Sequence, residues 1–141
     1  MTPRTVAPDH RKLRGAAASV VLAMGGVFLL IAALFVAAPA LGATVFGIPA
    51  PDGAGLAYVR ALGLRDLALG LYLIGLAVFS SRRAAGIVLA ATLVVPAGDM
   101  LLVLAWQGLS SPGHLLLHGF SGACAAAVAV WLLRPEAGRA G

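Results

Sequence analysis

Charge is what this chain has least of. Charged side chains make up 11% of its 141 residues, whereas hydrophobic side chains make up 61%. An ordinary soluble domain carries about 25% charged residues. A soluble protein of this length could not bury so much apolar side chain, and the mean hydropathy is +1.00. The sequence therefore predicts an integral membrane protein whose solvent is the lipid bilayer.

Cysteine is almost absent too. The single residue, Cys124, excludes an intrachain disulfide and is predicted to be a small packing residue in a helix interface. The chain also lacks a P-loop, a Cys-x-x-Cys pair, a His-Glu-x-x-His motif and a Gly-x-Ser-x-Gly motif. No sequence motif therefore assigns a cofactor, and we expect none.

The basic residues are present but confined to a few places. The net charge is +5, which alone would suit a nucleic-acid partner. Eight of the ten Lys and Arg residues, however, lie at the two ends and in one short turn. Basic flanks of apolar helices are typical of cytoplasmic loops. The distribution therefore indicates a membrane protein that does not bind nucleic acid.

Long apolar stretches recur four times. We predict an all-α, antiparallel bundle of four transmembrane helices, since about twenty residues cross a hydrocarbon core of about 30 Å. The spans are expected at residues 17–38, 57–80, 84–106 and 114–133. Between them, the Gly- and Pro-rich segment 40–55 is predicted to be an external loop. Residues 1–15 are expected to form a disordered basic arm and residues 134–141 a short tail.

The positions of Lys and Arg predict the orientation. The arm, the tail and the turn that holds Arg82 and Arg83 contain the eight basic residues, and four spans put these three segments on one side. We predict that this side is cytoplasmic, in a multi-pass protein of the plasma membrane. A cleavable signal peptide is the alternative for the first span, although its apolar stretch exceeds the usual 7–15 residues.

Two carboxylates interrupt the apolar spans. Asp66 and Asp99 are costly within a bilayer, so they mark a functional site by default. Counted along the helices from the outer side, Asp66 lies ~13 Å deep, Asp99 ~10 Å and His118 ~6 Å. Three spans thus bring ionisable groups to the same outer half of the bilayer. Candidate partners of the carboxylates are Arg60, Arg65, His114 and His118.

Helix phase orients the second span. Gly63, Asp66 and Gly70 share one stripe, and glycines let another backbone approach closely, so we expect this stripe to face the bundle interior. Arg65 points about 100° away from Asp66, so it is predicted to reach another helix or to extend outward rather than to pair with Asp66. Tyr72, deeper in the same span, is expected in the core.

The third span is expected to bend. Pro96 with Gly98 predicts a local kink that frees backbone carbonyls near Asp99.

The motif around Asp66 resembles that of a known family. The run Tyr58–Gly70 reads R-x-x-G-x-R-D-x-x-x-G from Arg60 onward. It resembles the signature of small four-span membrane proteins of bacteria and fungi that form a family of unknown function, distantly similar to DoxX-like proteins. Pro39, the Phe-Gly-Ile-Pro run at 46–49 and the Gly-Asp and His-Gly pairs at 98–99 and 118–119 extend the likeness over residues 20–133. The resemblance implies a four-helix membrane bundle and no established activity.

Several functions fit this pattern. The leading hypothesis is a pocket that binds or converts a lipophilic molecule with a polar head, such as an isoprenoid, a quinone or a polyketide. In it, Asp66 and Asp99 act as acid or base and His118 as proton partner. Arg60, Arg65 and His114 are predicted to bind the ligand. Metal binding is disfavoured because the arginines compete for the same carboxylates.

Three alternatives stay open. The charges could act only as interhelical glue in a non-catalytic accessory subunit of a membrane complex. Such a subunit would need small-residue faces on its outside, for which the Gly25-Gly26 pair and Gly119 with Gly122 are candidates. A proton or ion path is another possibility. A transporter would require a homo-oligomer, since one small bundle has little room for alternating access.

Overall fold

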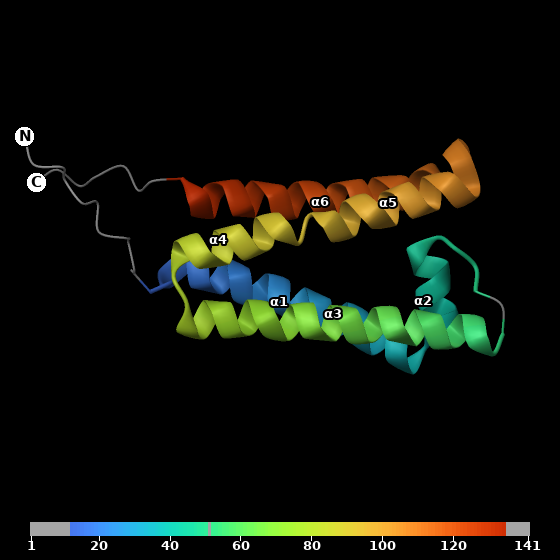
Figure 1. Cartoon of the computed structure of the whole chain (residues 1–141), viewed down its shortest axis with the longest axis horizontal. Helices are drawn as coiled ribbons and strands as arrows, with labels where there is room; N and C mark the ends of the chain where they lie inside the picture. Colours follow the sequence, from blue (N-terminus) through green and yellow to red (C-terminus); the bar gives the residue numbers. More distant parts are fainter. Residues whose placement is uncertain (1–11, 51, 135–141) are drawn as a thin grey trace, which may run out of the picture.

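The computed structural model describes residues 12–50 and 52–134, and this part of the chain is almost entirely helical (Figure 1). It contains no β-strand, only an isolated bridge between Lys12 and Ser81. The helices are α1 (Gly15–Ala37), α2 (Pro39–Phe46), α3 (Ala54–Phe79), α4 (Arg82–Ala91), α5 (Val94–Gln107), the 3-10 turn η1 (Gly108–Ser110) and α6 (Pro112–Leu133). The predicted all-α fold is confirmed.

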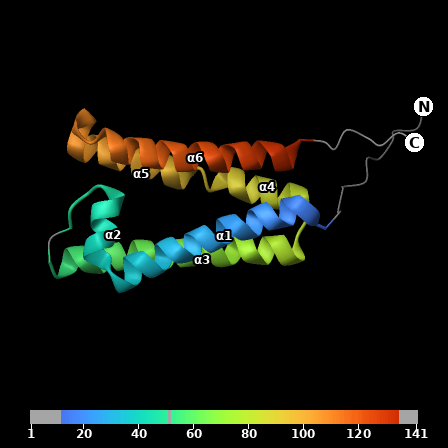
Figure 2. The ribbon, with the colours of Figure 1, turned by 180° about the vertical axis from the view of Figure 1, so that it is seen from behind.

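The helices form two antiparallel hairpins. One hairpin pairs α1 with α3, and the other pairs the α4–α5 stretch with α6, as both views show (Figures 1 and 2). The short helix α2 lies between the hairpins at one end. The four stretches long and apolar enough to cross a bilayer are Gly15–Ala37, Ala54–Phe79, Arg82–Ser110 and Pro112–Leu133. The chain is therefore a multi-pass membrane protein with four spans.

Glycines bring α1 and α3 into backbone contact. A Cβ atom added to Gly25 would lie 3.1 Å from the carbonyl oxygen of Gly70, and one added to Gly70 would lie 3.0 Å from that of Gly25. Gly63 approaches the carbonyl oxygen of Ala32 in the same way, at 3.2 Å. The predicted inward stripe is confirmed, since Gly63, Asp66 and Gly70 are all buried. Gly25 belongs to this internal contact, so its prediction as an outer docking face is wrong.

Gly119 and Gly122 also face inward in part, whereas a Cβ atom added to Gly26 would meet nothing within 4 Å. A Cβ atom on Gly122 would meet the ring of Pro96 at 3.4 Å, and the nearest atom to one on Gly119 would be Sδ of Met100 at 3.8 Å. Both contacts join α6 to α5 within the second hairpin.

Polar contacts fasten each hairpin at the end of the molecule where α4 begins. The amide of Leu13 donates to the carbonyl of Ser80 at 2.9 Å, which fixes the segment before α1 to the α3–α4 turn. Arg82 Nε donates to the carbonyl of Leu132 at 3.1 Å, and its guanidinium lies 4.9 Å from the ring centre of Trp131. Residues 1–11 of the predicted disordered arm and 135–141 of the tail lie outside the described residues.

The third span is broken rather than gently kinked. Helix α4 ends at Ala91 and α5 begins at Val94, because Pro96 has no N–H to donate to the carbonyl of Thr92. That carbonyl instead accepts from Val95 at 3.0 Å. The predicted distortion is thus present, but it lies about 10 Å along the helix from Asp99. The prediction of freed carbonyls near Asp99 is wrong.

The predicted external loop 40–55 contains a helix. Pro39 occupies the first turn of α2, where its fixed φ favours helix and its missing N–H is not needed. Gly47 ends the helix with a φ of 98°, a left-handed conformation that glycine adopts without a steric penalty. The Gly and Pro residues that predicted a loop therefore act as the boundaries of a short helix.

Candidate functional site

Arg65 lies between two carboxylates from different spans. Its Nε and Nη2 atoms both donate to Oδ1 of Asp66 at 3.1 Å. Its Nη1 atom lies 3.5 Å from Oδ1 of Asp99 on α5. Within residues 12–50 and 52–134, this ion pair is the only side-chain polar contact between α3 and α5. We call these three residues the Arg65 triad.

The two carboxylates are buried and the guanidinium is partly accessible. Asp66 is 4% exposed and Asp99 is 9% exposed, whereas the side chain of Arg65 is 35% exposed. The prediction that Arg65 reaches another helix is confirmed by its contact with Asp99. The prediction that it does not pair with Asp66 is wrong, because its long, flexible stem lets the guanidinium fold back over the adjacent carboxylate.

Each carboxylate uses only one oxygen for Arg65. In the described part of the chain, no hydrogen bond reaches Oδ2 of Asp66 or of Asp99. The two Oδ2 atoms are therefore free to accept a hydrogen bond from a group outside the described residues, although Asp66 and Asp99 are themselves largely buried.

Arg60 does not join the triad. Its Nε atom donates to the carbonyl of Val36 at the end of α1, at 3.4 Å, and the residue is exposed. The predicted pair of arginines around one ligand is therefore not assembled in this structure.

The histidines form a second polar group. His114 Nε2 lies 3.0 Å from the carbonyl of Thr44, and its Nδ1 lies 2.6 Å from the hydroxyl of Ser111. A carbonyl only accepts hydrogen bonds, so Nε2 must carry the proton that it donates. The Ser111 hydroxyl can then donate to Nδ1 of a neutral ring. His114 thus serves as a donor to the end of α2.

Two further side chains hold the same end of α2. His118 Nε2 donates to the carbonyl of Phe46 at 2.9 Å, and the two rings meet edge to face with centres 5.1 Å apart. The side-chain amide of Gln107 donates to the carbonyl of Gly47. The last carbonyls of a helix have no partner within the helix, so these donors from α5 and α6 provide the missing hydrogen bonds.

The six predicted site residues therefore separate into groups. Arg65, Asp66 and Asp99 come together, His114 and His118 bind α2, and Arg60 lies apart. Within the described residues, no hydrogen bond or ion pair links either histidine to either aspartate. The catalytic and binding roles of all six stay predictions. Sequence reasoning missed Gln107, whose position in a turn resembled an ordinary polar loop.

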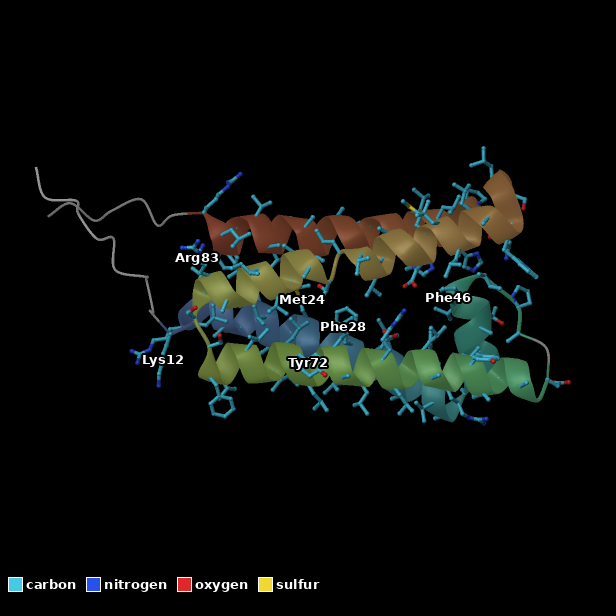
Figure 3. All side chains as sticks on the ribbon, viewed as in Figure 1. Lys12, Met24, Phe28, Phe46, Tyr72 and Arg83 are labelled. Carbon is cyan, nitrogen blue, oxygen red and sulfur yellow. The ribbon has the colours of Figure 1, made fainter. Side chains whose placement is uncertain are left out.

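Two other expectations are corrected. Tyr72 is 63% exposed on α3 rather than packed in the core, and Figure 3 shows where it lies on that helix. Cys124 is exposed on α6 rather than packed between helices. The residues next to them in sequence, Leu73 and Ala125, are the ones that pack in or against the core. No group of three His, Cys, Asp or Glu residues in the described ranges could hold a metal ion.

The attachment of α2 makes a specific prediction for Gly47. A Cβ atom there would lie 2.6 Å from Cγ of His114, in addition to the penalty for a positive φ. We expect Gly47→Ala to lower the unfolding free energy in detergent by about 1–3 kcal/mol. In a His114→Ala background, which removes the ring that the new methyl group meets, the same substitution should cost less. Equal losses in the two backgrounds would contradict the close packing of His114 on α2.

The family model described as Domain of unknown function (DUF4267) matches residues 25–132, which include the Arg65 triad and both histidines. The chain belongs to this family. No curated protein and no solved structure matches it. The distant likeness to DoxX-like proteins and the R-x-x-G-x-R-D signature stay predictions for this family member.

Proposed function

We propose that the Arg65 triad is the binding site of a lipophilic small molecule with a polar head group. The observation that supports this most is the sharing of one guanidinium by two buried carboxylates from different spans, each with a second oxygen that accepts no hydrogen bond from the described residues. Ionisable groups inside membrane spans usually serve a substrate or an ion. A ligand that comes from the bilayer reaches such a site without leaving an apolar environment.

The carboxyl groups of the triad can act as general acids or bases. Arg65 binds one oxygen of each carboxylate, so each Oδ2 is left to accept a hydrogen bond from a ligand. A carboxyl group in that arrangement can take a proton from a bound hydroxyl or amine and return it. The same groups would serve simple binding, so conversion of the ligand is a second step that the experiment below distinguishes.

The histidines have a positioning role in this proposal. His114, His118 and Gln107 hold the end of α2 between the two hairpins, beside the outer half of α3 and α5. Removing these hydrogen bonds would loosen α2 without touching the triad. In this proposal, neither histidine contacts the ligand.

We also propose that the protein lies in the plasma membrane with both termini in the cytoplasm. Lys12, Arg14, Arg83 and Arg134 are exposed, and Figure 3 shows Lys12 and Arg83 at the same end of the molecule. The charged loop residue Asp52 precedes α3 at the other end. Basic residues concentrated at one end of a bundle favour that end for the cytoplasm.

Reporter fusions test this orientation. We expect fusions after Arg83 and at the C-terminus to report the cytoplasm, and an insertion beside Asp52 to report the outside. Exchanging Arg82 and Arg83 for neutral residues should weaken the bias in favour of this orientation. A cytoplasmic signal at Asp52 would contradict the proposed topology.

The second candidate is a non-catalytic subunit of a membrane complex or homo-oligomer. The observation in its favour is that Arg65–Asp99 joins two spans, which is also what a purely structural ion pair would do. In that case the triad would matter for folding and for nothing else.

Metabolite profiling separates the two candidates. A strain that lacks the gene is complemented with the wild type, with Asp99→Asn or with Asp52→Asn, and its lipid-soluble metabolites are compared. We expect the wild type and the Asp52→Asn control to restore the profile. The Asp99→Asn protein should accumulate in folded form, because Arg65 still pairs with Asp66. It should nevertheless fail to restore the metabolite profile. Full restoration by Asp99→Asn would refute the proposed site.

A further inference from the structure

We infer that the head group recognised by the Arg65 triad is cationic and that it replaces a proton held by the unliganded site. This inference rests on the proposed binding site and specifies its ligand. It starts from a charge imbalance. The triad joins two carboxylates to one guanidinium, so with both carboxylates ionised it carries one negative charge in excess.

No other cation in the described part of the chain is ion-paired with these carboxylates. The helical residues of α1 and α2 include no ionisable side chain. On α3, Arg60 keeps its charge, but it is exposed and donates to the carbonyl of Val36 rather than to a carboxylate. On α6, the histidines donate to carbonyls of α2. Arg82 and Arg83 begin α4 at the far end of the molecule.

The apolar surroundings make the excess negative charge energetically unfavourable. From the start of α3 at Ala54, Asp66 lies about 18 Å along the helix, and Asp99 lies about 12 Å before the end of α5 at Gln107. Leu64 and Leu67 beside Asp66, and Leu101 beyond Asp99, are exposed and face the lipid. An unpaired charge at such a depth is strongly unfavourable, so the unliganded site holds a proton on one of its two carboxylates.

An anionic head group does not fit this arrangement. It would bring a second negative charge beside the carboxylates, while Nε, Nη2 and Nη1 of Arg65 are already directed at Asp66 and Asp99. A cationic head group fits, because it pairs with the two Oδ2 atoms, which accept no hydrogen bond from the described residues, as the proton leaves to water. One positive charge enters and one leaves, so the triad stays neutral in both states and no other reactant is required.

The test uses a pair of probes with the same shape and opposite charge. Tetraphenylphosphonium and tetraphenylborate are titrated into the purified full chain in detergent by calorimetry, in two buffers of different ionisation enthalpy. We expect tetraphenylphosphonium to bind with release of one proton, and its affinity to rise about tenfold per pH unit while the site is protonated. Tetraphenylborate should not bind at this site.

Variants connect the binding to the triad. Asp99→Asn should weaken tetraphenylphosphonium roughly thirtyfold or more and abolish the proton release, because the neutral amide leaves no excess charge. Asp52→Asn, in the exposed loop, is the control and should bind as the wild type does. The proton count and pH slope of the wild type test the inference even if a variant fails to fold.

The outcomes separate the inference from the proposed function. Cation binding without proton release, or binding that Asp99→Asn leaves unchanged, would overturn the inference. Tetraphenylborate binding that Arg65→Met abolishes would overturn it as well but keep a ligand site at the triad. Binding of neither probe by the folded wild type would also overturn it, while the metabolite experiment decides independently whether the triad has a function.

Discussion

Arg65→Met should lower the unfolding free energy of the bundle by about 3–5 kcal/mol. The substitution leaves Asp66 and Asp99 buried with no cation between them, and methionine keeps the apolar stem of the arginine. Asp99→Asn should cost far less, because the Arg65–Asp66 pair stays intact and the group becomes neutral. Thermal unfolding in detergent, or titration with a denaturing detergent, would measure both losses.

Two further variants complete this comparison. Arg60→Met removes an exposed guanidinium that meets only the carbonyl of Val36, so its effect should stay within about 0.5 kcal/mol. The triple variant with Arg65→Met, Asp66→Asn and Asp99→Asn should recover much of the stability lost by Arg65→Met alone, since no unpaired charge is left. Similar losses for Arg65→Met and Arg60→Met would show that the triad is not a buried charge network.

Gly70→Ala should destabilise the first hairpin by about 1–3 kcal/mol. The new methyl group would lie 3.0 Å from the carbonyl oxygen of Gly25 and 2.9 Å from Cδ2 of Leu29. The leucine can move, but the backbone of α1 cannot yield without separating from α3. Contact between the helices would then be lost around Gly63 as well.

Gly75→Ala on the same helix is the matched control. An added Cβ there meets nothing within 4 Å, and alanine favours helix over glycine by up to about 1 kcal/mol, so stability should be unchanged or higher. The two variants therefore differ in sign, and thermal unfolding of both proteins under one condition measures the difference. A stable Gly70→Ala protein would mean that α1 and α3 are not in backbone contact.

The four spans could be predicted because they depend on local composition. A stretch of about twenty apolar residues needs no tertiary contact to be recognised, and the helical stripe of Gly63, Asp66 and Gly70 indicated its buried face correctly. The meeting of Asp66 and Asp99 was expected from their similar depth. These features depend on distance along a helix, which a sequence gives directly.

The rest depends on contacts between distant residues. Helix α2 has eight residues, too few to be stable alone, and its end is held by side chains some 60–72 positions further along the chain. No local sequence pattern predicts that Gln107 will donate to the carbonyl of Gly47. The histidines were assigned to the carboxylates because the sequence gives depth but not direction, and α2 supplied acceptors where a loop was expected.

The adjacency of Arg65 and Asp66 has a consequence for how the protein enters the membrane. The two neutralise each other within one helix, so α3 carries its own counterion when it leaves the translocon. Asp99 follows later in the chain with no partner of its own, and an aspartate at the centre of a span costs about 3 kcal/mol on the insertion scale. Arg65 is by then already in the bilayer, so synthesis from the N-terminus places the cation there before the carboxylate that needs it. A chain rearranged to begin with the second hairpin would have the same residues and would insert poorly.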